Sequence, residues 1–160
     1  MARPAVQDYY PDDFAVCFGC GRLNEHGHLL KSYVEGDEVV AAFHPAAHHL
    51  ALPGFVYGGL IASLIDCHSM ATASAAALRE AGKTVGSGPS PRYVTAALHV
   101  DYLKPTPIGL PLEIRARPRE IKGRKVVVES SVSAGGELTA RGEVIAVQLP
   151  DHMTARPRQS

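Results

Sequence analysis

The sequence predicts an α+β fold in which one long helix packs on an antiparallel β-sheet. Gly54–Leu78 is a weakly charged stretch in which two glycines precede a pattern of helical periodicity at Ile61, Leu64, Ile65, His68 and Thr72. Alternating segments rich in Val, Ala and Thr lie on both sides of it. Tight turns join most of these segments, which favours antiparallel neighbours. The predicted strands are Leu29–Glu35, Glu38–His44, Tyr93–Leu103, Leu112–Glu120, Lys125–Ala134 and Glu137–Gln148.

The length and composition are typical of one globular domain. The 160 residues are 46% hydrophobic and 20% charged, and sixteen basic residues balance sixteen acidic ones. No net field therefore favours nucleic acid or an anionic membrane as a partner. We expect an irregular arm at 1–16, the domain at 17–150 and a flexible tail at 151–160.

Two further features bear on the cellular compartment. The N-terminus has no apolar segment of the signal-peptide kind, and three cysteines do not suggest a disulfide scaffold. Asp66, His68 and several serines interrupt the apolar stretch, so we expect no run long enough to span a bilayer. Together these features predict a cytoplasmic protein.

The predicted helix carries one acid among apolar residues. Gly58, Ala62 and Asp66 follow one another at a spacing of four and so share a stripe of the helix. Free N–H groups at a helix start attract negative charge, and glycine at 58 and 59 leaves room for a substrate carbonyl. Apolar surroundings would raise the pKa of the carboxyl group of Asp66 and make it a better base near neutral pH. His68 is interpreted as a hydrogen-bonded core histidine.

Two cysteines near the N-terminus have the spacing of a metal or redox motif. Cys17 and Cys20 form a C-x-x-C pair, which could begin a zinc site or a redox pair. No second pair is present, and completion by His26 or His28 fits no standard module. We therefore favour a structural turn with two buried thiols and expect no metal.

Three histidines, His44, His48 and His49, precede the helix in a loop rich in Pro and Ala. A metal site is conceivable there, but sequence neighbours tend to point apart. Solvated or hydrogen-bonded loop histidines are the favoured interpretation. After the helix, a Gly- and Pro-rich segment at 79–92 is predicted to be a long mobile loop, which in compact domains is often functional.

The strand at 93–103 has a regular alternation of side chains. If it is regular, one face carries Ala96, Leu98, Val100 and Tyr102, and the other carries Thr95, His99 and Asp101.

Three motifs resemble those of a known family, the hotdog-fold acyl-CoA thioesterases. Pro53–Asp66 resembles the His-Gly-Gly…Asp motif, and the nearest type is the phenylacetyl-CoA thioesterase (PaaI-like) group. Cys17–Leu29 resembles the opening segment of many such proteins, and Thr95–Pro107 resembles a later one. The three motifs occur in the order and spacing of the family, and the resemblance spans about residues 17–148. It implies a curved antiparallel sheet around the helix, homodimers that often pair into tetramers, and active sites at the dimer interface.

The resemblance also implies roles for particular residues. The backbone N–H of Gly58 would bind the thioester carbonyl, and Asp66 from the facing protomer would act as general base or nucleophile. Thr95 would orient the nucleophile or the attacking water. The candidate substrate-binding residues are Tyr57, Gly59, Ser63 and Arg92. No cofactor is expected beyond the coenzyme A that forms part of the acyl-CoA substrate.

The sequence departs from the family pattern at two positions. Tyr57 occupies the place of the motif histidine, and Ala51 that of an amide found in some relatives. Hydrolysis of a small, medium-chain or aromatic acyl-CoA is the leading hypothesis. A non-catalytic module that binds an acyl or aromatic ligand is the alternative, and a dehydratase is a third, although neither His68 nor His99 is placed beside Asp66 by the pattern. A basic group could meet the coenzyme A phosphates or be a solvated strand edge: Arg115, Arg117, Arg119, Lys122, Arg124 and Lys125.

Overall fold

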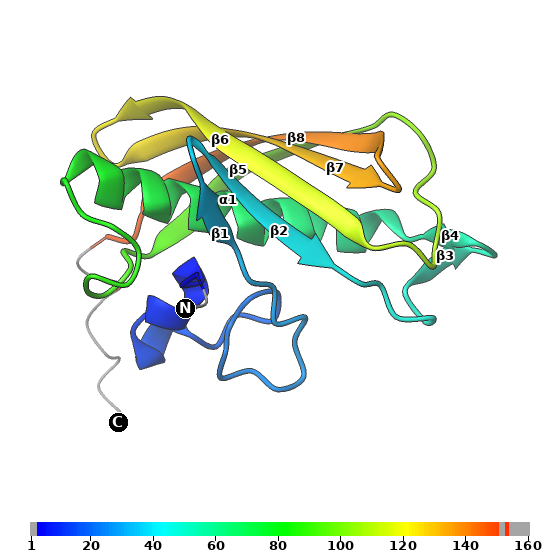
Figure 1. Ribbon diagram of the computed structural model, residues 1–160, viewed down its shortest axis with the longest axis horizontal. Coiled ribbons are helices and arrows are strands. Elements are labelled where there is room, and N and C mark those ends of the chain that lie inside the picture. The colour runs from blue at the N-terminus through cyan, green and yellow to red at the C-terminus, as the bar shows by residue number, and fades with distance from the viewer. Residues whose placement is uncertain (1–2, 151–152, 154–160) are drawn as a thin grey trace.

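In this computed structural model, which describes residues 3–150 and 153, one helix lies against a six-stranded antiparallel sheet (Figure 1). The helix, α1, covers Gly58–Glu80, and the sheet order is β1-β2-β6-β7-β8-β5. The strands are β1 (Tyr33–Glu35), β2 (Glu38–Phe43), β5 (Tyr93–Tyr102), β6 (Leu112–Lys122), β7 (Lys125–Ala134) and β8 (Glu137–Gln148). This is the hotdog fold, and the predicted α+β class is confirmed.

Local turn chemistry accounts for the three long strands of the C-terminal half. The β6–β7 and β7–β8 hairpins turn at Gly123 and at Gly135–Gly136, all with positive φ, a conformation that glycine adopts without a steric penalty. The predicted bounds of β7 and β8 are confirmed, and β6 continues two residues beyond its predicted end.

The N-terminal half differs more from the prediction. The first strand begins at Tyr33 rather than Leu29, because Leu29 has a left-handed φ of 54° and the Leu30 N–H donates to the carbonyl of Gly19. A small second sheet, β3 (Leu50–Leu52) with β4 (Phe55–Val56), precedes the helix and was not predicted. Strands of two or three residues are too short to show an alternating pattern.

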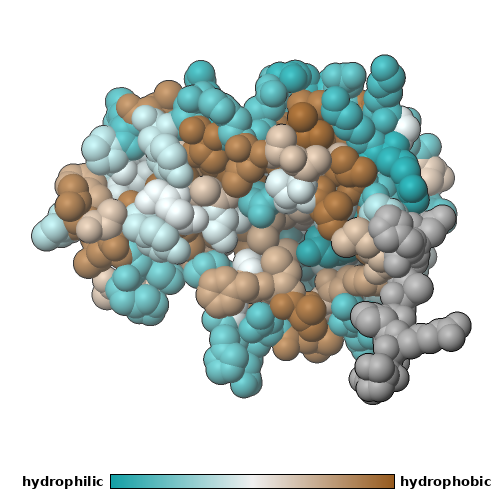
Figure 2. Space-filling view, turned by 180° about the vertical axis from the view of Figure 1, so that it is seen from behind, coloured by the Kyte–Doolittle hydropathy of each residue, from teal (hydrophilic) through white to brown (hydrophobic). Residues whose placement is uncertain are grey.

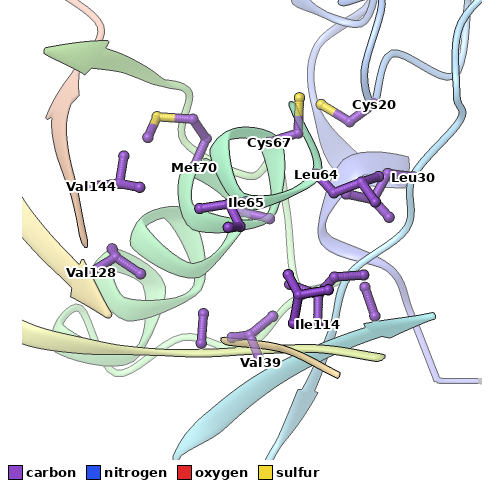
Figure 3. Packing of buried hydrophobic residues seen from close by; sticks show 14 of the residues in the cluster. Cys20, Leu30, Val39, Leu64, Ile65, Cys67, Met70, Ile114, Val128 and Val144 are labelled. Carbon is purple, nitrogen blue, oxygen red and sulfur yellow. The ribbon is translucent and has the colours of Figure 1, made fainter. Parts of the chain in front are cut away.

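Helix α1 is buried on most of its circumference. Its sheet-facing side packs Ile65 and Met70 among Val128 and Val144 (Figure 3). Its opposite side is covered by the N-terminal segment, which runs beneath the helix in Figure 1. Alanine, serine and glycine dominate the helix, so both layers approach it closely.

The N-terminal segment contributes to the core. It contains two 3-10 helices, η1 (Val6–Tyr9) and η2 (Asp12–Phe14), where an irregular arm was expected. Val6 and Tyr10 are buried in the hydrophobic cluster around α1. The Ser90 N–H and hydroxyl donate to the carbonyls of Tyr9 and Val6, so the loop after α1 is hydrogen-bonded to this segment. The predicted tail at 151–160 lies outside the described residues except for Met153.

A buried polar network connects the N-terminal segment, the helix and the sheet. His68 Nε2 donates to the carbonyl of Val39 at 2.8 Å, so its Nδ1 accepts from the Ser32 hydroxyl at 2.8 Å. The amide of Gln7 completes the network by bonding both the hydroxyl and the N–H of Ser32. The interpretation of His68 as a hydrogen-bonded core residue is confirmed.

The expectation about apolar length needs correction. By length and composition α1 could cross a bilayer, because Asp66 is followed by an alanine-rich stretch with little charge. However, 72% of its most apolar 18-residue window is buried inside the protein. Helices buried in a protein core can have the same length and apolar composition as a membrane-spanning helix. Packing inside the protein therefore accounts for the apolar character of α1.

The outer face of the sheet, away from α1, is covered by charged side chains. Arg115 pairs with Glu38 at 2.8 Å and with Glu113 at 2.8 Å. Further acids on this face pair with Arg117 and Arg119. For these three arginines the ion pairs favour a solvated sheet face over a site for the coenzyme A phosphates.

The His68 network predicts a loss of stability in mild acid. Burial lowers the pKa of His68 to about 4, an effect opposed by its bond to Val39. Between pH ~6.5 and ~4 the unfolded chain binds a proton that the folded chain does not, so the free energy of unfolding falls as pH falls through this window, by up to about 3 kcal/mol. Urea unfolding at a fixed protein concentration measures it. His68→Gln should remove this component; identical pH dependence in both proteins would contradict it.

Candidate active site

Asp66 and Thr95 meet where the third turn of α1 lies beside the start of β5. The Thr95 hydroxyl donates a hydrogen bond to Oδ1 of Asp66. Asp66 is half-buried, whereas Thr95 is exposed at the surface. The structure therefore brings together two of the three predicted catalytic residues, with one carboxylate oxygen held by the threonine.

The surroundings of Asp66 raise the pKa of its carboxyl group above the usual value. Burial is the largest cause, and it is opposed by the hydrogen bond from Thr95. Smaller opposing effects come from the sulfur of Cys17, which raises the pKa, and the guanidinium of Arg92, which lowers it. This direction agrees with the expectation from sequence, and a raised pKa improves a carboxylate as a base near neutral pH.

A β-bulge places Thr95 on the helix-facing side of the sheet. The pairing of β5 with β8 shifts register between Thr95 and Ala97, so one residue is inserted there. The predicted alternation, which put Thr95 on the same face as His99 and Asp101, is therefore wrong at Thr95. His99 and Asp101 pair with each other on the outer face.

The start of α1 presents backbone donors. The first N–H groups of a helix have no intrahelical partner, and within 3–150 no hydrogen bond is formed to the N–H of Gly58 or Gly59. The preceding residue is held in place because the Tyr57 N–H donates to the carbonyl of His49 at 3.1 Å. The Tyr102 hydroxyl donates to the carbonyl of Gly58 at 2.7 Å. This end of the helix can bind a partially negative oxygen.

Two tyrosine rings explain the glycines more directly than a substrate does. A Cβ atom at Gly59 would lie 2.5 Å from Cε2 of Tyr57, which is too close for any real contact. A Cβ at Gly58 would lie 3.2 Å from the Tyr102 ring. The expectation that both glycines leave room for a substrate is thus incomplete, since the rings of Tyr57 and Tyr102 already use the space beside them.

The two halves of the predicted machinery are far apart within one chain. Gly58 and Asp66 are eight residues apart on a straight helix, and a rise of 1.5 Å per residue separates them by about 12 Å. A thioester carbonyl bound at Gly58 is therefore out of reach of the carboxylate of the same copy.

The remaining predicted residues lie at the helix start, on α1 and before β5. Arg92 stacks its guanidinium over the ring of Tyr10 at 4.7 Å and donates to the carbonyl of Tyr93. Ser63 is half-buried on α1, where a Cβ at Gly19 would lie 3.7 Å from its hydroxyl. The substrate-binding roles of Arg92, Ser63, Tyr57 and Gly59 stay predictions.

Two of the three loop histidines, His48 and His49, form a ring cluster with His28. His49 contacts both His48 and His28 edge to face, with ring centroids 4.5 and 5.4 Å apart, and its Nδ1 accepts the Ala46 N–H. Burial lowers the pKa of His28 and of His49. Among residues 3–150 and 153 no three candidate metal ligands gather here. His49 is a hydrogen-bonded loop residue, one of the two states expected for these histidines.

Sequence reasoning missed a cluster of three sulfurs beside Asp66. Cys67 follows Asp66 on α1, and its Sγ lies 3.8 Å from that of Cys17. Cys20 completes the cluster, with all three sulfurs within 4.8 Å of one another. Cys20 is buried as expected, but Cys17 is only half-buried. The sequence did contain a sign of this cluster: Cys67 is a third cysteine, on the apolar side of the predicted helix, in a chain that also has one C-x-x-C pair.

The chain was compared with known proteins. The family profile described as the thioesterase superfamily matches residues 53–141. A thioesterase superfamily protein from Shewanella loihica, solved as a crystal structure, is 51% identical with a TM-score of 0.65, and the match covers 79% of this chain and 96% of that one. A Streptococcus mutans protein solved bound to acetyl-CoA has the same fold, with 20% identity, a TM-score of 0.58, and coverage of 75% and 88%.

Curated relatives match a shorter part of their own length. Acyl-coenzyme A thioesterase THEM4 of Rattus norvegicus is 30% identical over 109 residues, which are 68% of this chain and 41% of that protein. The Xenopus laevis protein of the same name is also 30% identical, over 68% of this chain and 43% of its own length. This chain thus spans about two fifths of these relatives.

The contact between Thr95 and Asp66 predicts a measurable change in the carboxyl titration. Thr95→Val keeps the shape but removes the hydroxyl that stabilises the charged carboxylate, so the pKa of Asp66 should rise further. Thr95→Ser is the control and should leave the pKa close to that of the unaltered protein. Carboxyl-carbon NMR titration measures all three. A pKa unchanged in Thr95→Val would show that the hydroxyl does not stabilise the carboxylate.

Proposed function

We propose that this chain, which belongs to the thioesterase superfamily, hydrolyses an acyl-CoA thioester to a free acid and coenzyme A at sites shared by two copies. The observation that supports this proposal most directly is the half-buried carboxylate of Asp66. One of its oxygens accepts a hydrogen bond from Thr95, and burial raises the pKa of the carboxyl group. The names of the curated relatives support coenzyme A thioesters as the substrate class.

In the proposed reaction Asp66 acts as a general base. Thr95 occupies Oδ1, which leaves the second carboxylate oxygen to take a proton from an attacking water. The water oxygen adds to the thioester carbonyl carbon, and the carbonyl oxygen gains negative charge. Collapse of this intermediate breaks the carbon–sulfur bond, and coenzyme A leaves as its thiol after taking up the proton.

The developing negative charge is stabilised at the start of α1 in a second copy. The N–H groups of Gly58 and Gly59 are the preorganised donors, and one such donor contributes on the order of 100- to 1,000-fold in rate. A second copy is needed because about 12 Å separates Gly58 from Asp66 along a single helix.

The edge of the sheet suits this arrangement. Strand β5 is an edge strand of ten residues whose outer backbone groups are available for pairing, and it begins with Tyr93 beside the site. Hydrophobic patches are interspersed with hydrophilic residues on the face seen in Figure 2. Exposed apolar side chains on or next to β5 and before the helix start include Leu98, Tyr102, Leu103 and Phe55. Pairing of two β5 edges would continue the sheet across a homodimer and cover these side chains.

Finer features remain part of the proposal. The PaaI-like type, pairing of dimers into tetramers and a cytoplasmic location follow from the resemblance and the composition. The acyl group is placed among small, medium-chain and aromatic acids. Light scattering with size-exclusion chromatography measures the number of copies, and a strictly monomeric, active protein would overturn the shared site.

Removal of the acid should slow turnover strongly. We expect Asp66→Asn to lower kcat/KM for acyl-CoA substrates by about 100-fold or more, because general base catalysis contributes roughly that much. Chromatographic quantification of released coenzyme A is the measurement, since the protein's own thiols would react with colorimetric thiol reagents. Asp101→Asn, an acid on the outer sheet face, is the matched control and should keep full activity. Full activity in Asp66→Asn would exclude Asp66 as the base.

Mixed dimers test whether the site is shared. Asp66→Asn removes the base, and Gly58→Val crowds the helix start against Tyr102. A heterodimer of one Asp66→Asn copy and one Gly58→Val copy is isolated through two different affinity tags. If each site combines Asp66 of one copy with Gly58 of the other, one site carries both changes and the other carries none. About half of the unaltered activity should return, as expected for a two-fold symmetric pair. An inactive heterodimer from two folded variants would place both groups of each site in a single copy.

The alternative function is a non-catalytic module that binds acyl-CoA or an aromatic ligand. The observation in its favour is Tyr57, whose ring packs against Gly59 at the position of the motif histidine. Calorimetric titration with a non-hydrolysable acyl-CoA analogue, run beside the turnover assay, separates the two functions. Tight binding with no coenzyme A released from any substrate in the panel would favour the binding module.

A further inference from the structure

Three cysteines from two distant segments converge beside α1. Cys17 and Cys20 come from the N-terminal segment and Cys67 from the helix, fifty residues away. Figure 3 shows the sulfur atoms of Cys20 and Cys67 side by side at the surface of the helix. The 3.8 Å between the sulfurs of Cys17 and Cys67 is longer than a disulfide bond of about 2.05 Å.

The spacing of the sulfurs matches thiolate coordination. Zinc–sulfur bonds of about 2.3 Å at tetrahedral angles place two sulfurs about 3.8 Å apart, which is the separation seen between Cys17 and Cys67. Because all three sulfurs lie within 4.8 Å of one another, a point exists within about 2.8 Å of each of them. A contraction of about half an ångström would complete three metal–sulfur bonds.

The loop that carries Cys17 and Cys20 packs closely against α1. A Cβ atom at Gly19 would lie 2.3 Å from the sulfur of Cys67, so glycine is required for the loop to approach the helix this closely. The C-x-x-C loop is therefore folded around the sulfurs.

The charges near the sulfurs also suit a metal complex. Three thiolates and one divalent cation have a net charge of −1, and the guanidinium of Arg92 interacts electrostatically with all three sulfurs. The hydroxyl of Tyr10 is buried in the same region, where the guanidinium of Arg92 lies 4.7 Å from the centroid of the Tyr10 ring.

We propose that Cys17, Cys20 and Cys67 form a trithiolate site for one thiophilic divalent metal ion, with zinc as the representative. The described residues supply three ligands, so the fourth position is taken by water or an external thiol that enters on the half-buried side of Cys17. The bound ion fastens the N-terminal segment to α1 next to Asp66. This site is independent of the proposed hydrolysis, because none of the three cysteines takes part in that reaction.

The site gives a role to a cysteine that is buried on α1. The sulfur of Cys67 faces the N-terminal loop and lies 3.8 Å from the sulfur of Cys17. The sequence argument against zinc was the missing second C-x-x-C pair. A helix residue fifty positions away supplies the third thiolate instead, which no local spacing reveals.

Cobalt and zinc titrations of the full-length, reduced and metal-free protein test the proposal. One equivalent of Co²⁺ should give thiolate-to-cobalt charge-transfer bands and intense tetrahedral d–d bands, and one equivalent of Zn²⁺ should abolish them. Each of Cys17→Ser, Cys20→Ser and Cys67→Ser should weaken binding by at least about 100-fold, more than the loss of an outer-shell partner costs. His48→Ala is the control and should bind as the unaltered protein does.

A second measurement needs no variant to fold. Zn²⁺ should protect the thiol of Cys17 from alkylation by iodoacetamide, as read by mass spectrometry of the intact and digested protein. Absence of sulfur-to-cobalt bands, or equal alkylation with and without Zn²⁺, would overturn the proposal. So would a Cys17–Cys67 disulfide that forms in air despite excess Zn²⁺, because that result identifies a redox pair instead.

Discussion

The structure depends on the burial of a single helix around almost its whole circumference. Helix α1 has small and apolar residues on every side, so a sheet on one side alone would leave much of it exposed. The N-terminal segment covers the second side, and the loop after α1 is hydrogen-bonded to that segment. The long-range network through Ser32 and His68 joins the same three parts.

This burial sets the properties of Asp66. The acid lies where the helix passes the start of β5, half removed from water, with Thr95 as its hydrogen-bond partner. Desolvation raises the pKa of the carboxyl group of Asp66. The helix separates the backbone positions of Asp66 and Gly58 by about 12 Å. Asp66 and the helix start at Gly58 lie on the same helix and cannot act on one thioester carbonyl within a single copy. The proposed reaction therefore requires a second copy of the chain.

Much of the fold could be predicted because its signals are local. Alternation and glycine turns marked β6, β7 and β8 to within two residues, and helical periodicity marked α1. The misses have equally physical reasons. β3 and β4 are too short to alternate, and the first strand starts late because Leu29 is left-handed. The structure of the N-terminal segment comes from contacts with distant residues, which no local pattern encodes.

For the site, the sequence by itself determined the types of group: a lone acid on an apolar helix, glycines at the helix start and three cysteines. The tertiary structure decided which groups meet. A one-residue bulge in β5 turned Thr95 toward Asp66, the rings of Tyr57 and Tyr102 filled the space beside the glycines, and the N-terminal loop carried Cys17 to Cys67. Spacing along a chain reports neighbours within one element, whereas contacts between elements depend on register and packing, which form only when the whole core is assembled.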